Sequence, residues 1–269
     1  MSDLNNVFSN LKRQGNGALI GYLTGGDPEP QFTPRLAEAL VKGGVDVLEL
    51  GVPFSDPIAD GPVIQAASVR ALAAGTTLKM VLELAREIKK KYNVPVVILT
   101  YFNPVFKMGV ADFFKRAQRC LVDGVVVPDL PVEEADNYKK AAGAYRVDTI
   151  FLAAPSTTNE RLEKIIACSS GFLYVVSHFG VTGEIANIEK STIKLVKRVA
   201  KSVKGRIPVA VGFGISKPEH VKSVIKAGAN GAIVGSAFIN IVSHNIKNHK
   251  KMLLKLEETA RALKKATLP

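Results

Sequence analysis

The feature of this sequence that most constrains its fold is a repeated alternation of short apolar runs with longer amphipathic segments. The apolar runs contain few polar residues, which is typical of parallel strands covered on both faces. Eight runs are predicted as strands: Ala18–Leu23, Val45–Leu50, Val96–Tyr101, Gly124–Val127, Thr149–Ala153, Phe172–Val176, Pro208–Val211 and Ala232–Val234. The segments between them are predicted as helices near residues 35–43, 63–91, 111–121, 132–143, 158–168, 189–203, 217–227 and 248–265.

Eight alternating units favour an α/β fold of the closed (β/α)₈ type, the TIM barrel, which uses about 250 residues. An open doubly wound sheet is the alternative, but it usually shows a GxGxxG motif after its first strand. Here the first strand leads into Thr24–Pro28, which lacks that spacing. Because no linker or low-complexity stretch divides the chain, we expect residues 1–269 to form a single domain.

Composition narrows the classes of function. Cys120 and Cys168 lie in no CxxC or His-rich spacing, so no metal site is expected. No signal peptide and no run of 18 or more apolar residues is seen, so we expect a cytoplasmic protein without a membrane partner. The net charge of +12 raises nucleic acid as a partner, but the lysines are scattered and aromatic residues do not interleave with them. Solvated helix faces are therefore favoured over a nucleic-acid surface.

Two carboxylates stand out at the end of the second predicted strand. Side chains alternate along a strand, so Val45, Val47 and Glu49 are expected to share one face. A charge on a face built for burial is costly unless it is paired or functional. Asp60 follows in a loop rich in Pro, Gly and Asp, and the two carboxylates could divide acid and base roles. The alternative is that Glu49 pairs with a buried Lys or Arg and that Asp60 caps the helix beginning near Pro62.

Glycines follow the last two predicted strands. Gly212-Phe213-Gly214 comes after the seventh strand and Gly235-Ser236 after the eighth, where Ser236 would open a short extra helix. Backbone N–H groups in such loops and at a helix start can bind an anion, and barrel enzymes often hold phosphate there. We therefore predict a phosphate site at the C-terminal ends of strands 7 and 8, although turns alone also use glycine. Gly180 and Gly183 lie in another loop that is long enough to act as a lid.

These motifs together resemble the tryptophan synthase alpha subunit family, over essentially the whole chain. The resemblance is carried by Leu48–Gln65, Thr24–Pro28, Asp129–Glu134, Gly180–Gly183, Gly212–Ser216 and Gly235-Ser236. It implies a lyase of tryptophan biosynthesis that cleaves indole-3-glycerol phosphate to indole and glyceraldehyde 3-phosphate. It also implies a beta subunit that carries pyridoxal phosphate, joined in an alpha2-beta2 heterotetramer, with no cofactor in this chain.

The resemblance also assigns roles to residues. Glu49 would move protons at indole C3 and at the side-chain hydroxyl, Asp60 would bind the indole N–H, and Tyr174 would support the substrate. The remaining assignments are a phosphate site (Gly183, Phe213, Gly214, Gly235, Ser236), an indole pocket (Tyr22, Leu99, Tyr101, Val126), a lid residue that bonds Asp60 (Thr182) and a partner surface (Pro53, Asp56, Pro57, Asn103, Pro131).

Departures from the family pattern lie near the lid and the pocket. His178-Phe179 stands where many relatives have Arg-Ala, Glu184 follows the lid motif, and Tyr22 replaces a common Phe. Two other functions remain open at this stage. An indole-glycerol-phosphate synthase would want a lysine at a strand end, and none is present there. A catalytically silent activator of a beta subunit would not need Glu49 and Asp60.

Overall fold

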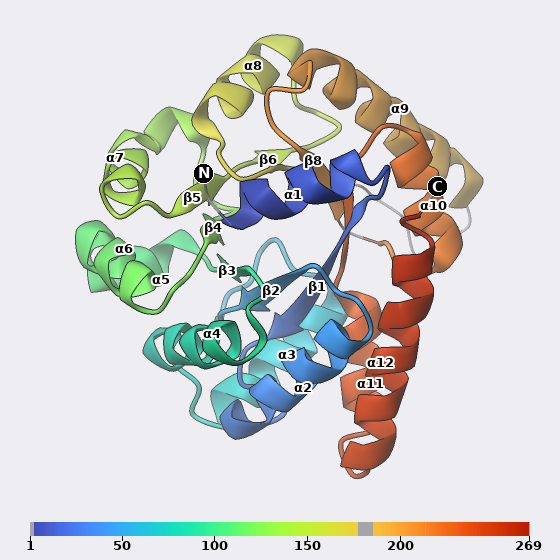
Figure 1. Ribbon diagram of the computed structural model, residues 1–269. Coiled ribbons are helices and arrows are strands. Elements are labelled where there is room, and N and C mark those ends of the chain that lie inside the picture. The colour runs from blue at the N-terminus through green and yellow to red at the C-terminus, as the bar shows by residue number, and fades with distance from the viewer. Residues whose placement is uncertain (1–2, 177–184, 213, 269) are drawn as a thin grey trace.

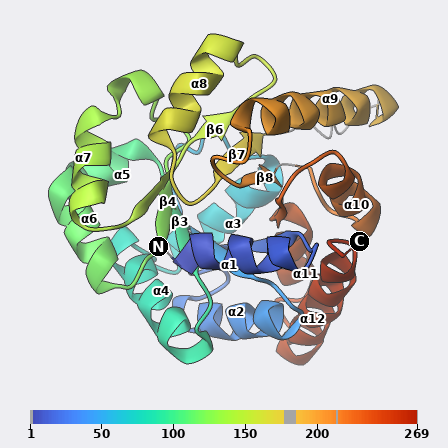
Figure 2. The ribbon, with the colours of Figure 1, turned by 45° about the horizontal axis from the view of Figure 1, so that its top comes forward.

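The fold is a parallel β-barrel inside a ring of helices (Figures 1 and 2). The computed structural model describes residues 3–176, 185–212 and 214–268, with the backbone alone at 185–190. All strand pairs are parallel, and the order around the sheet is β5-β4-β3-β2-β1-β9-β8-β7-β6. The strands are β1 (Ala18–Thr24), β2 (Val47–Gly51), β3 (Val96–Leu99), β4 (Gly124–Val126), β5 (Asp148–Ile150), β6 (Leu152–Ala153), β7 (Leu173–Val176), β8 (Val209–Gly212) and β9 (Gly231–Val234).

The barrel closes through one extended segment. Strands β5 and β6 are separated only by Phe151, and they correspond to the single predicted strand Thr149–Ala153. Strand β5 pairs with β4 on one side, and β6 pairs with β7 on the other. The two ends of the sheet are thus joined by the chain itself. The predicted barrel is confirmed, and the open doubly wound sheet is wrong.

Helices surround the strands of the barrel (Figure 2). They are α1 (Asp3–Arg13), α2 (Thr33–Lys42), α3 (Pro62–Ala73), α4 (Leu78–Tyr92), α5 (Phe102–Met108), α6 (Val110–Arg119), α7 (Asp136–Ala144), α8 (Asn159–Cys168), α9 (Ile185–Val203), α10 (Pro218–Lys226), α11 (Ser236–His244) and α12 (His249–Lys265), with 3₁₀ turns η1 (Pro30–Phe32) and η2 (Val132–Glu134). No helix in the described part of the chain is long and apolar enough to cross a membrane.

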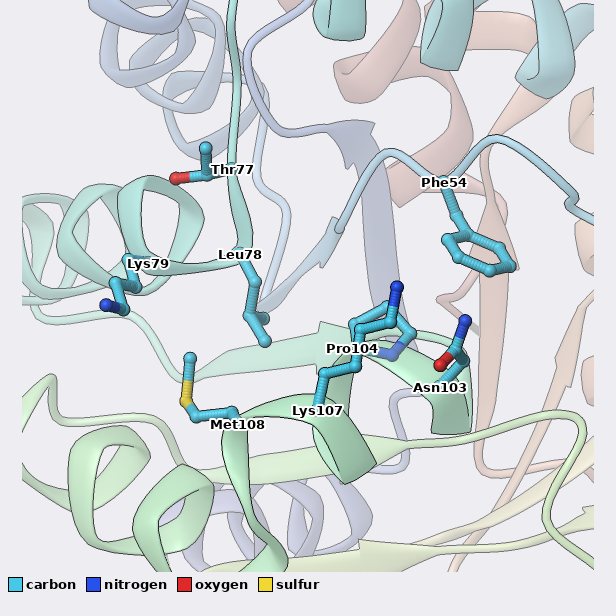
Figure 3. A pocket seen from close by; sticks show the side chains of 8 residues that line it. All are labelled: Phe54, Thr77, Leu78, Lys79, Asn103, Pro104, Lys107 and Met108. Atoms are coloured by element: carbon cyan, nitrogen blue, oxygen red, sulfur yellow. The ribbon is translucent and has the colours of Figure 1, made fainter.

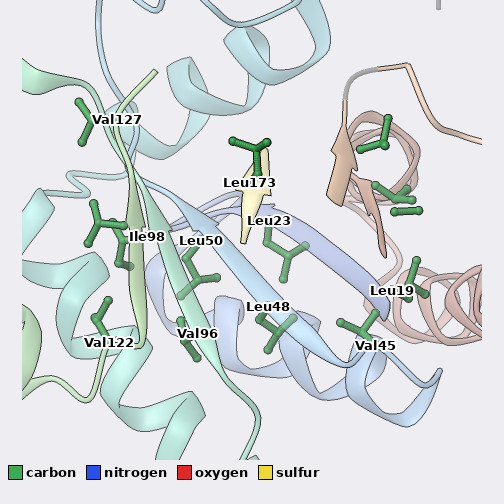
Figure 4. Packing of buried hydrophobic residues seen from close by; sticks show 14 of the residues in the cluster. Leu19, Leu23, Val45, Leu48, Leu50, Val96, Ile98, Val122, Val127 and Leu173 are labelled. Atoms are coloured by element: carbon green, nitrogen blue, oxygen red, sulfur yellow. The ribbon is translucent and has the colours of Figure 1, made fainter. Parts of the chain in front are cut away.

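Strand side chains divide the apolar core into two layers. Leu19 and Leu48 lie in the outer layer, between the strands and the helices (Figure 4). Ile20 and Val47, each next to one of these residues in the sequence, point into the barrel instead. Val45 was expected to share the inner face with Val47, but this is wrong, because it packs in the outer layer. The N–H of Val45 bonds Leu40 at the end of α2, so strand β2 begins only at Val47.

Two elements differ from the predicted pattern in ways that shape the barrel. The predicted helix 63–91 is two helices, because Gly75 adopts a positive φ of 78° and Thr77 then caps α4 by accepting the Met80 N–H. Helix α1 was not predicted. It places Leu4 and Phe8 against the inner layer, with the Phe8 ring 5.7 Å from that of Phe172. Helix α1 therefore closes the N-terminal end of the barrel (Figure 2).

Candidate active site

Glu49 occupies the interior of the barrel. It stands on β2 in register with Tyr22 of β1 and Val97 of β3. It is 1% exposed, and neither carboxyl oxygen has a hydrogen-bond partner among the described residues. The alternative in which a buried Lys or Arg neutralises Glu49 is therefore wrong for this part of the chain.

Burial sets the protonation state of Glu49. The loss of hydration disfavours the charged form and, together with the nearby negative charge of Asp60, raises the pKa of Glu49 to about 8. At neutral pH the carboxyl group therefore keeps its proton. An acid in that state can donate the proton to a substrate atom and then act as a base.

Asp60 lies in the loop between β2 and α3, where its side chain is half-buried. Gly61 precedes the first residue of α3, and no side chain caps that helix. Gln65 donates to Asp60, but to the main-chain carbonyl rather than to the carboxylate, at 2.8 Å. The capping alternative is therefore wrong, and the Asp60 carboxylate is available to the barrel interior.

Asp60 has a lower pKa than Glu49, since it is less deeply buried and a donor partly offsets that burial. Burial raises the pKa of Asp60 to about 6, while a hydrogen bond from Tyr101 favours the charged form and acts in the opposite direction. Between pH of about 6 and about 8, the site thus contains one protonated and one ionised carboxyl group. That combination suits an acid paired with an electrostatic stabiliser.

Tyrosines from separate strands converge on this pair. Tyr22 bonds the hydroxyl of Thr24 at 3.3 Å, and Tyr174 stands on β7. Burial, together with the negative charges of Glu49 and Asp60, raises the pKa of both phenols well above the ordinary value. Both phenols are therefore neutral and lie within electrostatic reach of the two carboxyl groups.

The predicted indole wall is largely one apolar cluster. Tyr22, Leu99 and Val126 belong to the inner layer, which also contains Tyr174. Tyr101 lies apart from that layer, buried at the start of α5, and stacks on Phe54 with ring centroids 5.2 Å apart. The structure thus brings three of the four predicted wall residues together with Tyr174 around the barrel interior. It places the fourth, Tyr101, at the loop that carries Asp60.

The glycines at the ends of β8 and β9 lie beside these tyrosines. A Cβ atom on Gly212 would lie 2.4 Å from the hydroxyl of Tyr174, and one on Gly235 would lie 3.2 Å from the Tyr22 ring. Helix α11 starts directly after Gly235, as predicted, and its first N–H groups have no preceding carbonyl within the helix. Ser236 is exposed at this start. The geometry is suitable for an anion bound next to the carboxyl pair.

Other assigned residues fall outside this centre. Gly183, Thr182 and Phe213 lie outside the described residues. Among the predicted partner contacts, Asp56 and Asn103 are exposed, whereas Pro53 is buried. Pro57 and Pro131 are half-buried. No group of three or more His, Cys, Asp or Glu side chains that could hold a metal ion occurs within the described ranges.

The sequence reasoning missed one contributor to the site, Phe54. Its ring stacks on Tyr101 at an interplanar angle of 27°. The available signal was an aromatic residue directly after a strand, in Val52-Pro53-Phe54. That signal does not reveal the partner, because Tyr101 comes after the next strand, β3.

Comparison with known proteins agrees with the fold. The profile of the family described as tryptophan synthase alpha chain matches residues 8–268. The tryptophan synthase alpha chain of Solibacter usitatus is 46% identical over 265 residues, which covers 98% of each chain. The crystal structure of the alpha subunit from Legionella pneumophila superposes with a TM-score of 0.90 at 34% identity, covering 99% of this chain and 98% of that one.

A chain from the tryptophan synthase complex of Pyrococcus furiosus superposes with a TM-score of 0.83 at 39% identity, covering 92% of this chain and 98% of that one. Both the family profile and the full-length relatives cover the strands, the carboxyl pair and the glycine loops. The chain belongs to the tryptophan synthase alpha chain family.

Proposed function

We propose that this chain cleaves indole-3-glycerol phosphate to indole and glyceraldehyde 3-phosphate, with Glu49 and Asp60 as its catalytic carboxyl groups. The observation that carries the assignment is the pair itself. Glu49 is buried, has no hydrogen-bond partner in the described part of the chain and keeps its proton at neutral pH. Asp60 beside it is ionised at that pH.

The two protonation states fit the order of steps in a retro-aldol cleavage. Glu49 donates its proton to indole C3, which leaves a cationic indolenine ring. The Asp60 carboxylate accepts a hydrogen bond from the ring N–H and stabilises the positive charge that develops there. Glu49, now ionised, takes the proton of the side-chain hydroxyl as the C–C bond breaks, so that the aldehyde leaves and indole is restored. One residue thus acts as acid and then as base.

The substrate would lie between the strand ends with its phosphate towards the glycine loops. Backbone N–H groups and the start of α11 would bind the phosphate, and the indole ring would pack on apolar and aromatic side chains. The proposed phosphate residues are Gly183, Phe213, Gly214, Gly235 and Ser236, and the proposed ring contacts are Tyr22, Leu99, Tyr101 and Val126. Tyr174 would support the substrate, and Thr182 would close over it.

A beta subunit is the proposed partner, in an alpha2-beta2 assembly. Support comes from the solved relative that belongs to the tryptophan synthase complex of Pyrococcus furiosus. The pyridoxal phosphate chemistry would belong to that partner. The proposed contact surface is Pro53, Asp56, Pro57, Asn103 and Pro131. Because Pro53 is buried in the chain alone, its part in the contact would be to fix the loop that carries Asp56.

Replacing Glu49 with Gln tests the catalytic assignment. The amide keeps the shape of the side chain but cannot shuttle a proton, so indole release should fall by about 10²–10⁴-fold. Calorimetry should show substrate binding within a few-fold of wild type. Glu258→Gln, an exposed position on α12, serves as the matched control. Near-normal turnover of Glu49→Gln would remove Glu49 from the mechanism.

A silent activating subunit is the alternative function. It would bind the beta partner without releasing indole on its own. No observation on the described residues favours it, because a buried carboxyl group without a partner costs stability and brings no benefit to a purely structural subunit. Indole release by the isolated wild-type chain separates the two functions.

A further inference from the structure

The hydroxyl of Tyr101 lies against two consecutive residues, Ala59 and Asp60, of the loop between β2 and α3. Tyr101 is 2% exposed at the residue before α5. Its hydroxyl oxygen accepts the Ala59 N–H at 3.0 Å. The same hydroxyl faces the carboxylate of Asp60, the next residue along, and its hydrogen-bonding influence favours the charged form of that carboxyl and so lowers its pKa. A phenol has one hydrogen to donate and lone pairs to accept, so both interactions can exist together.

The ring of Tyr101 is held from the outside. Phe54, from the start of the same loop, stacks on it at 5.2 Å between centroids. Phe54 also lines a groove on the surface of the barrel together with Asn103, Pro104 and Lys107 (Figure 3). The ring therefore lies between a side chain at the groove edge and the loop that carries Asp60.

The backbone next to Tyr101 is held as well. The N–H of Phe102 donates to the Asp129 carboxylate at 2.9 Å, which ties the start of α5 to the loop after β4. Tyr101 is thus fixed at its ring and at its main chain before it contacts Asp60. A side chain restrained in this way loses little freedom when it hydrogen-bonds, which is what a supporting residue of a catalytic group requires.

We propose that Tyr101 is a positioning residue, which holds the Asp60 carboxylate and the Ala59 N–H in place through its hydroxyl and is itself held by the Phe54 ring. This inference rests on the proposed function, in which Asp60 accepts the indole N–H. It gives Tyr101 a role beyond that of a pocket wall, since the hydroxyl is directed to the loop.

Within the described residues, Tyr101 is the group whose hydrogen bond favours the charged form of Asp60. The titratable groups that face Asp60 from the described elements are Tyr22 on β1, Glu49 on β2, Tyr101 after β3 and Tyr174 on β7. Asp129 faces Tyr101 from the loop after β4. None of the other groups is a cation that could replace the Tyr101 hydroxyl.

Tyr101→Phe tests the proposal because it keeps the ring and the stack and removes only the hydroxyl. We expect kcat to fall about ten-fold, the effect of losing a hydrogen bond to a charged group, with KM changed less than three-fold. In the plot of kcat/KM against pH, the fall on the acid side (the acid limb) should move to higher pH. The reason is that Asp60 loses the hydrogen bond that lowers its pKa. The substrate phosphate titrates identically with both proteins, so it cannot produce a difference between them.

Tyr138→Phe is the matched control. Tyr138 is also buried, and among the described residues its hydroxyl bonds only the backbone carbonyl of Val125 on β4, at 3.5 Å. We expect no shift of the acid limb there. Placing 3-fluorotyrosine at position 101 should move the limb to lower pH, because the more acidic phenol donates more strongly. A merely structural role of Tyr101 would lower the unfolding temperature without moving the limb in either direction.

The outcomes separate this inference from the proposed function. If the wild-type chain releases indole and Glu49→Gln does not, the function stands. An unchanged kcat and an unchanged acid limb in Tyr101→Phe would then overturn the positioning role alone. If Asp60→Asn keeps full activity, the role of Asp60 fails and the positioning of that group fails with it.

Discussion

At the scale of single residues, the burial that makes Glu49 an acid also makes it costly. In the unfolded chain its pKa is near the ordinary value of 4.5, and in the folded chain it is about 8. Between these values the folded chain holds a proton that the unfolded chain has lost. The free energy of unfolding therefore falls as pH rises through this window, and the fall ends above a pH of about 8.

Glu49→Gln should remove this pH dependence. Because an amide does not titrate, the free energy of unfolding of the variant should not share the fall seen in wild type. The difference between variant and wild type should therefore grow by a few kcal/mol, to order of magnitude, from pH 5.5 to pH 8.5. Denaturant unfolding at the two pH values measures the change. The exposed Glu258→Gln should track wild type at both values. Parallel stability curves for Glu49→Gln and wild type would show that Glu49 ionises normally in the folded chain.

The position of Glu49 inside the barrel could be predicted from sequence, and the hydroxyl contact of Tyr101 could not. Alternation along one strand is local, so it places Glu49 on the face of Val47 without any knowledge of neighbours. It failed at Val45 because the hydrogen bond from Val45 to the preceding helix shortens the strand. The contact between Tyr101 and Ala59 joins two different loops, and spacing along the chain carries no information about it.

At the scale of elements, strands were predictable and helix boundaries were less so. Each predicted strand has a counterpart, because a short apolar run in a parallel sheet is covered on both sides. The break between α3 and α4 depends on Gly75 and on the Thr77 cap, which periodicity alone does not register. Helix α11 was predictable because Gly235-Ser236 provides a start signal directly after β9.

Ser236→Asp tests the phosphate site at the start of α11. A carboxylate there suits the helix dipole, so the unfolding temperature should not fall. The same charge should repel the substrate phosphate and raise KM by about ten-fold or more. Binding of indole, which has no phosphate, should stay at the wild-type level. Equal losses for indole and for the phosphorylated substrate would mean that the site as a whole was damaged.

At the scale of the whole molecule, closure of the barrel brings distant parts of the chain into one site. The segment 148–153 pairs with β4 on one side and β7 on the other, so residues from β2 and β7 face each other across the interior. The carboxyl pair lies on β2 and in the loop after its C-terminal end, whereas α1 closes the N-terminal end of the barrel (Figure 2). A partner that acts on catalysis would therefore bind at the end opposite α1.

Asn103→Arg tests the proposed partner surface. Asn103 is exposed at the groove beside Phe54, and a longer charged side chain there should obstruct the beta subunit. We expect the concentration of beta subunit needed for half-maximal stimulation of indole release to rise about ten-fold or more, in line with a central interface contact. Asn6→Arg, exposed on α1 at the opposite end, is the matched control. Identical titrations for the two variants would place the interface elsewhere.

The measurement that tests the account most directly is the pH dependence of kcat/KM on the basic side. This parameter reports the free enzyme, in which the pKa of Glu49 is about 8. The substrate phosphate titrates near pH 6, on the acid side, and does not interfere there. If Glu49 must hold a proton to start the reaction, kcat/KM should be level near pH 7 and fall about ten-fold per pH unit above a pH of about 8. A kcat/KM that stays level or rises up to pH 9.5, in a chain that remains folded, would contradict the assignment of Glu49 as the acid.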